Sequence, residues 1–210
     1  MSKKNYPFMF IHGMLGFGQD EVINNYTPYF GMFSGSIVGM LKAEGKEAYA
    51  PTISSLGSAW DRACEIYAQI VGGTVDYGKV HSAKYGHSRF GRTYDRALVP
   101  EWGKLDEEGR RNKLHILGHS FGGATVRMFS QLMAFGAPEE VAGTDKGDIS
   151  PLFTGGKGDW IKSVTTIAGP HNGTTVMSAI GPLLPMLKCV TFFGFAGIMD
   201  NTPANRIYDM

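Results

Sequence analysis

Short apolar runs alternate with amphipathic segments along the first part of this chain. Pro7 to Ile11 (PFMFI) is a continuous apolar run that ends at His12-Gly13, typical of a buried strand leading into a glycine turn. Ser34 to Ala43 has a cap residue, apolar positions at helical spacing and a stop at Gly45, which predicts a helix. Glu47 to Pro51 is then expected to form a second strand.

The middle of the chain contains one clear helix and one aperiodic stretch. Ser58 followed by Asp61 resembles a capping box, and apolar residues at helical spacing behind it predict a helix over Ala59 to Val71. Thr74 to Tyr94 is rich in Gly, His, Tyr and Arg and follows neither period, so we expect an irregular excursion there. Leu105 to Arg111 is polar and is expected to be a solvated surface segment.

The next elements complete a repeating strand and helix order. Leu114 to Leu117 predicts another buried strand, followed by a helix that ends near Gly136, and Ser163 to Ala168 predicts the next strand. Strands that alternate with helices are the signature of a parallel sheet with crossover helices. The fold class is therefore α/β, with about four core strands.

Composition places the whole chain, residues 1–210, in a single domain. With 210 residues, 43% of them hydrophobic, it is long enough to bury a substantial core. The 20 basic and 19 acidic side chains give a net charge of +1, so nothing favours nucleic acid or an anionic membrane as a partner. Cys64 falls in a helical pattern of apolar residues, where we expect a buried free thiol.

Neither end of the sequence indicates a targeting or membrane segment. The start, MSKKNYPFMF, has two lysines before an apolar run that is too short for a signal peptide. The stretch Gly181 to Met199 approaches membrane-spanning length, but Pro185, Lys188 and interior glycines argue against a spanning helix.

The sequence Gly118-His119-Ser120-Phe121-Gly122 is a G-x-S-x-G motif between the predicted strand and helix. Such a turn holds a serine above the carboxyl edge of a sheet, and a Cβ at either flanking glycine would collide with its surroundings. We therefore interpret Ser120 as a nucleophile. His12-Gly13 follows the first strand, where this architecture has a loop that faces the nucleophile, so the N–H groups of Met14 and Phe121 are the predicted oxyanion donors.

Asp61, His81 and His87 are candidate metal ligands. One carboxylate at a helix start and two histidines in an aperiodic stretch offer one oxygen and two nitrogen donors, a set suited to zinc. The spacing alone is also compatible with solvated or hydrogen-bonded loop histidines.

The chain resembles the Bacillus and Geobacillus thermoalkalophilic lipases and their clostridial relatives. The likeness is carried by FIHGMLGFG, by SAWDRACEIYAQIVGGTVDYGKVHSAKYGHSRFGRTY, by GHSFGG and by SVTTIAGPHNGTT, and it runs from the first strand to about Thr175. It implies an α/β-hydrolase fold and a carboxylic ester hydrolase, triacylglycerol lipase-like, that acts through an acyl-enzyme. The implied substrates are long-chain acylglycerols, with synthetic polyesters as an extension from the clostridial likeness, and the implied location is extracellular.

The resemblance also implies metals. In this family the residues matching Asp61, His81 and His87 belong to a structural zinc site within an inserted excursion, here residues 58–94. The fourth family ligand, a second Asp, and the family's calcium site both fall outside this chain. Three ligands plus water would also suit metal-assisted hydrolysis, which we rank below serine catalysis.

The acid and base expected to activate Ser120 are not found in the sequence. Of the six histidines only His171 follows the strand after Ser120, and we interpret it as a structural residue, since the family's catalytic histidine comes from much farther on. Asp145, Asp148 and Asp159 lie in a glycine-rich loop, and Asp200 and Asp209 have no strand before them. We therefore expect a C-terminally incomplete fold with a candidate lid at residues 176–200. The alternative is a catalytically inactive zinc-binding fragment that lacks the triad Asp and His.

Overall fold

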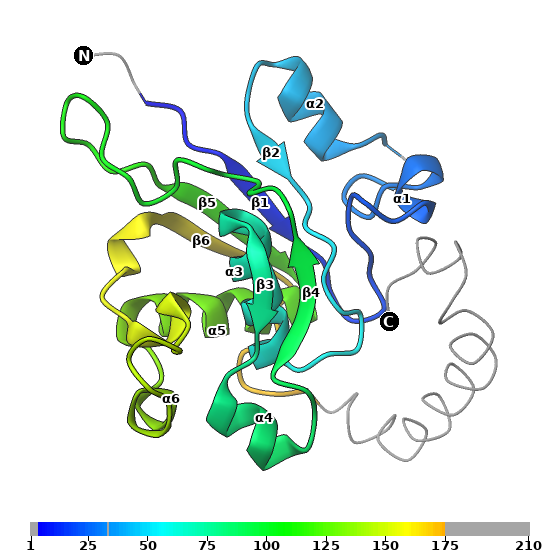
Figure 1. The fold of residues 1–210 in the computed structure, drawn as a ribbon. Coiled ribbons are helices and arrows are strands. Elements are labelled where there is room, and N and C mark those ends of the chain that lie inside the picture. The colour runs from blue at the N-terminus through cyan, green and yellow to red at the C-terminus, as the bar shows by residue number, and fades with distance from the viewer. Residues whose placement is uncertain (1–3, 33, 175–210) are drawn as a thin grey trace.

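The computed structural model describes residues 4–32 and 34–174 and centres on a parallel sheet of four strands in the order β2-β1-β5-β6 (Figure 1). The strands are β1 (Phe8–Ile11), β2 (Ala48–Tyr49), β5 (Leu114–His119) and β6 (Ile161–Ile167). All three neighbouring pairs are parallel. The predicted α/β arrangement of parallel strands with crossover helices is present.

Helices surround this sheet, and a small second sheet lies beside α3 (Figure 1). The second sheet pairs β3 (Gly73–Asp76) with β4 (Phe90–Tyr94). The helices are α1 (Ile23–Tyr26), α2 (Ile37–Ala43), α3 (Ala59–Val71), α4 (Lys79–Tyr85), α5 (Phe121–Phe135) and α6 (Pro138–Gly143), with short 3-10 turns at Pro151–Thr154 and Gly158–Trp160. Both α1 and α6 are short and are not predicted by the apolar pattern.

Strand β1 is covered on both faces, since successive side chains of a strand point to opposite sides of the sheet. On β1, Met9 and Ile11 are fully buried in the main core, to which α3 and α5 contribute. Phe10 points to the other face, where it packs in a second cluster with Val38 and Leu41 of α2. A strand buried on both sides needs an unbroken apolar run, which is what the PFMFI segment provides.

Helix α3 begins where its sequence predicts. The Ser58 hydroxyl accepts from the Asp61 N–H over 3.1 Å and caps the first turn. Most of the helix is buried, including the polar residues Arg62, Glu65 and Gln69, so it passes through the core. Cys64 is buried and free, as expected.

The prediction of an irregular excursion over Thr74 to Tyr94 is wrong. The segment forms β3, α4 and β4, with the two strands antiparallel and their register shifted between Thr74 and Asp76. Arg89 joins this hairpin to the segment that follows α6. It donates to Asp76 Oδ1 over 3.0 Å and to Asp148 Oδ2 over 2.6 Å. Long-range ion pairs of this kind leave no periodic trace in the sequence.

Other predicted segments agree with the structure to different degrees. The predicted strand over Glu47 to Pro51 is reduced to the two residues of β2, whereas α5 ends at Phe135 with Gly136 as its C-cap, near the predicted end. Within the described part of the chain, no helix combines the length and apolar character needed to cross a membrane. The candidate lid at 176–200 lies outside the described residues.

The strand order indicates which edge of the sheet is suited to a ligand. After β1 the chain adds β2 on one side, and later adds β5 and β6 on the other. In open parallel sheets, ligands bind at the carboxyl ends of the strands where this order reverses. Here Ile11 and Gly118 are paired at that edge, so the segments after β1 and β5 lie side by side.

Candidate functional site

Ser120 lies on the turn between β5 and α5. Its backbone has φ 53° and ψ −125°, a strained conformation for a residue with a side chain. The Ser120 N–H donates to Ile167 O over 2.9 Å, which ties the turn to the end of β6. Helix α5 begins at the next residue, so the positive end of its dipole lies beside Ser120.

The two glycines of the motif are required by close packing. A Cβ at Gly118 would collide with the carbonyl group of Gly122, and a Cβ at Gly122 would collide with the carbonyl oxygens of Ile11 and His12. These are backbone atoms that cannot move aside as the end of a side chain could. The steric reason for the two glycines of a G-x-S-x-G turn therefore holds in this protein.

The loop after β1 lies directly against the Ser120 turn. A Cβ at Gly13 would be 2.9 Å from Ser120 Cβ and 3.1 Å from His119 O, so only glycine permits this approach. The N–H groups of Met14 in this loop and of Phe121 at the start of α5 have no hydrogen-bond partner among the described residues. Both amides are thus available to a ligand at this edge of the sheet.

Two buried side chains hold the same loop from inside. His12 Nδ1 lies 2.8 Å from Gly13 O, and its Nε2 lies 3.1 Å from Ile53 O. Arg62 is fully buried and donates through Nη2 to His12 O and through Nη1 to Gly13 O, the latter over 3.4 Å. Burial, and then the Arg62 charge, lower the pKa of His12 to about 4, so its ring is neutral at pH 7.

Tyr29 holds the loop from its other side. The Gly13 N–H donates to the Tyr29 hydroxyl over 2.9 Å, and that hydroxyl lies 2.7 Å from His119 Nδ1. Because the hydroxyl accepts from the amide, its own proton can be donated to His119. His119 therefore has Tyr29, and not Ser120, as its hydrogen-bond partner among the described residues.

The remaining histidines near the sheet have structural partners. His171 Nε2 lies 3.0 Å from Thr166 Oγ1, and His115 Nδ1 lies 2.7 Å from Ser163 Oγ. Within the described residues no histidine is hydrogen-bonded to Ser120 Oγ. The structural interpretation of His171 is compatible with these contacts.

Two of the acidic residues considered as triad members form ion pairs. Asp148 lies 2.6 Å from Arg89, and Asp159 lies 2.7 Å from Arg111. Asp200 and Asp209 lie outside the described residues. Asp148 and Asp159 are thus paired with arginines in the described part of the chain.

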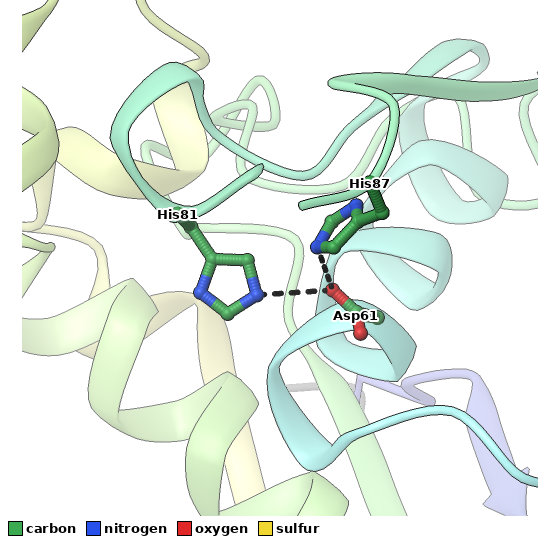
Figure 2. A group of neighbouring side chains, drawn as sticks. All are labelled: Asp61, His81 and His87. Atoms are coloured by element: carbon green, nitrogen blue, oxygen red, sulfur yellow. Dashed lines mark ion pairs between the residues drawn. The ribbon is translucent and has the colours of Figure 1, made fainter. Parts of the chain in front are cut away.

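The structure brings Asp61, His81 and His87 together as a possible metal-binding group. Figure 2 shows both imidazoles turned toward one carboxylate, with His81 Nε2 3.3 Å and His87 Nε2 3.9 Å from Asp61 Oδ1. Atoms bound tetrahedrally to zinc at about 2.1 Å are roughly 3.4 Å from one another. Asp61 Oδ1 is buried without a hydrogen-bond donor, so a cation would satisfy it. The donor set fits a metal ion.

The surroundings of the group orient its ligands. His87 Nδ1 lies 2.9 Å from Ser88 O, a contact that places the proton on Nδ1 and leaves Nε2 free. The indole ring of Trp60 stacks on His81 with centroids 4.7 Å apart and planes inclined by 9°. Burial lowers the pKa of His81, which favours the neutral ring that binds metals.

The metal-binding group lies in a cavity of its own. The cavity has a volume of about 500 Å³ and is lined by the three ligands together with residues of α3, α4, α5 and α6. Ser120 is not among its lining residues. The group and the serine therefore do not share this cavity.

Comparisons with known proteins show which family this chain resembles. The family model described as "Lipase-like, C-terminal domain" matches residues 4–202. Lipase 2 of Staphylococcus aureus is 41% identical over 202 residues, which cover 95% of this chain and 28% of that protein. The chain thus spans little more than a quarter of the length of this relative.

Two solved structures are also similar. Lipase 1 from Pelosinus fermentans superposes with a TM-score of 0.78 and 47% identity, covering 85% of this chain and 45% of that chain. EstA from Clostridium botulinum superposes with a TM-score of 0.73 and 43% identity, covering 85% of this chain and 39% of that chain.

Proposed function

Because the chain belongs to the family of lipase-like C-terminal domains, we propose that it provides the nucleophile of a carboxylic ester hydrolase. The chain superposes on the solved structures of Lipase 1 and EstA, so the expected α/β-hydrolase fold and the likeness to Bacillus-type lipases with clostridial relatives are confirmed. The similarity to enzymes named lipase favours this function over an inactive zinc-binding fragment.

In the proposed reaction Ser120 Oγ attacks the ester carbonyl carbon and gives its proton to a base. The carbonyl oxygen becomes negative and accepts hydrogen bonds from the N–H groups of Met14 and Phe121. Collapse of this intermediate breaks the ester bond, the alcohol leaves with the proton, and water then hydrolyses the acyl-serine to the acid. No histidine in the described part of the chain is hydrogen-bonded to Ser120 Oγ, and His171, the last histidine of the sequence, lies 3.0 Å from Thr166 Oγ1.

The observations that support the proposal are the strained backbone of Ser120, the close approach of Gly13 to it, and the absence of hydrogen-bond partners for the Met14 and Phe121 amides among the described residues. The test is turnover of p-nitrophenyl butyrate by the full-length protein and by Ser120→Ala. Turnover should fall to background in this variant because no other serine in the described part of the chain has a positive φ. Ser130 on the same helix, whose hydroxyl donates to Val126 O over 2.7 Å, gives the control variant Ser130→Ala, which should keep wild-type turnover. Turnover in Ser120→Ala would end the proposal.

The substrate class is a finer proposal that rests on the resemblance. We infer long-chain acylglycerols as substrates and synthetic polyesters as an extension, for an enzyme that acts outside the cell. A series of p-nitrophenyl esters from acetate to palmitate tests the chain length, and release of soluble acids from a polyester film tests the extension. A preference for acetate with no activity on longer chains would contradict the lipase proposal.

We propose that zinc binds Asp61, His81 and His87 and has a structural role. The support is the buried, donor-free Asp61 Oδ1 between two imidazoles and the separate cavity that contains them. Elemental analysis should find one zinc per full-length chain and none in His81→Ala, whereas His115→Ala should keep its zinc. Metal-assisted hydrolysis is the rival, and it would be favoured if chelation stopped turnover at once in protein that stays folded.

A further inference from the structure

The peptide unit that carries the Met14 amide is held by its carbonyl end. Gly13 O lies 2.8 Å from His12 Nδ1 and accepts from Arg62 Nη1 over 3.4 Å, while Arg62 Nη2 binds His12 O. In a trans peptide the C=O and N–H groups point in opposite directions. Fixing Gly13 O toward Arg62 therefore turns the Met14 N–H away from Arg62.

The preceding peptide unit follows the same rule. His12 O accepts from Arg62, and the N–H of that peptide, which belongs to Gly13, donates to the Tyr29 hydroxyl over 2.9 Å on the other side. Two successive carbonyls are thus directed at one guanidinium and their amides away from it. The loop is held in this orientation by a side chain of α3 together with one bond of its own, in which the Gly16 N–H donates to Gly13 O over 3.2 Å.

The same guanidinium also contacts the second oxyanion residue. Arg62 Cζ lies 5.1 Å from the centre of the Phe121 ring, an arrangement that favours a cation over an aromatic face. Arg62 is therefore in contact with both segments that offer amides next to Ser120. Burying a charged group is unfavourable unless its hydrogen bonds are made. An apolar side chain would fill the same space without this cost, so packing alone does not explain why an arginine stands here.

We propose that Arg62 is a positioning residue for the oxyanion site: it orients the Met14 amide by binding the carbonyl groups of His12 and Gly13, and supports Phe121 through its ring. The inference rests on the proposed function, since an oriented amide matters only if Ser120 reacts. Arg62 acts through the loop backbone and not on the substrate. Its loss should therefore affect the transition state more than substrate binding.

The test compares Arg62→Met and Arg62→Lys with Gln69→Met in the full-length protein. Gln69 is a buried polar residue of the same helix that binds Thr52 through its side chain, so its variant reports general damage to α3. We expect Arg62→Met to lower kcat for p-nitrophenyl butyrate by about 100-fold, comparable to loss of one oxyanion donor, with KM within about twofold. Arg62→Lys should lose about 10-fold, because an ammonium is a point donor rather than a fork.

The inhibition constant of a boronic acid is a second measurement, and general damage to the fold would not change it in parallel with kcat. The tetrahedral adduct of the boronic acid on Ser120 has an oxygen at the oxyanion position, so the Ki should rise by the same factor as kcat falls. Wild-type kcat in either folded Arg62 variant, or an equal loss in Gln69→Met, overturns the inference. If Arg62→Met does not fold, the lysine variant decides. Turnover in Ser120→Ala would instead defeat the hydrolase proposal itself.

Discussion

His12 should make the protein less stable as the pH falls from 7 to 5. Its pKa is about 4 in the folded protein, because burial and then Arg62 disfavour the charged ring, against about 6.5 in an unfolded chain. The unfolded state therefore binds more protons between these values. Stability from this group is complete above about pH 6.5 and is lost as the pH falls toward 4. The free energy of unfolding should drop by about 2 kcal/mol between pH 7 and pH 5.

Urea unfolding followed by circular dichroism at pH 7, 6 and 5 measures this loss. His12→Gln is the matched variant, because glutamine keeps an N–H donor at the same place and does not titrate. His81 and His115 also have a pKa lowered by burial, and they contribute equally to both proteins. The wild type should lose about 2 kcal/mol more than the variant between pH 7 and pH 5. Equal losses in the two proteins would refute the assignment of a neutral, buried His12.

Two further perturbations test the packing of the turn and the metal group. Gly122→Ala should lower the melting temperature by several degrees and abolish ester turnover, because the added Cβ collides with the carbonyl groups of Ile11 and His12. A variant with wild-type melting temperature and turnover would contradict the close packing of Gly122 against these carbonyls. EDTA should lower the melting temperature of the wild type, with recovery on adding zinc, and should leave that of His81→Ala unchanged; an equal effect on both would mean that chelation acts elsewhere.

Local signals in the sequence are sufficient for much of the fold and for the serine turn. The apolar run of β1, the capped helix α3 and the G-x-S-x-G motif each depend on residues close together in the chain. For the same reason the steric role of Gly118 and Gly122 follows from the motif and its position between a strand and a helix. Grouping Asp61 with His81 and His87 depends on the resemblance to the lipase family, because spacing in the sequence does not show that the start of α3 lies next to α4.

What the sequence does not reveal depends on distant contacts. The hairpin of β3 and β4 is interrupted by α4 and has a shifted register, so no period marks it. Arg62 is a charged residue in the first turn of α3, and such residues are usually exposed to solvent. In the structure it is fully buried, and its guanidinium donates to the carbonyl groups of His12 and Gly13. Tyr29 is likewise brought to the Gly13 amide only by the path of the loop.

Labelling of the full-length protein with a fluorophosphonate tests whether Ser120 is an activated nucleophile, since covalent attachment requires an activated serine and a site that accepts a tetrahedral centre. Mass spectrometry should find one adduct per chain on the peptide that contains Ser120, and none in Ser120→Ala. An unlabelled Ser120 in folded protein that still hydrolyses esters would contradict the account.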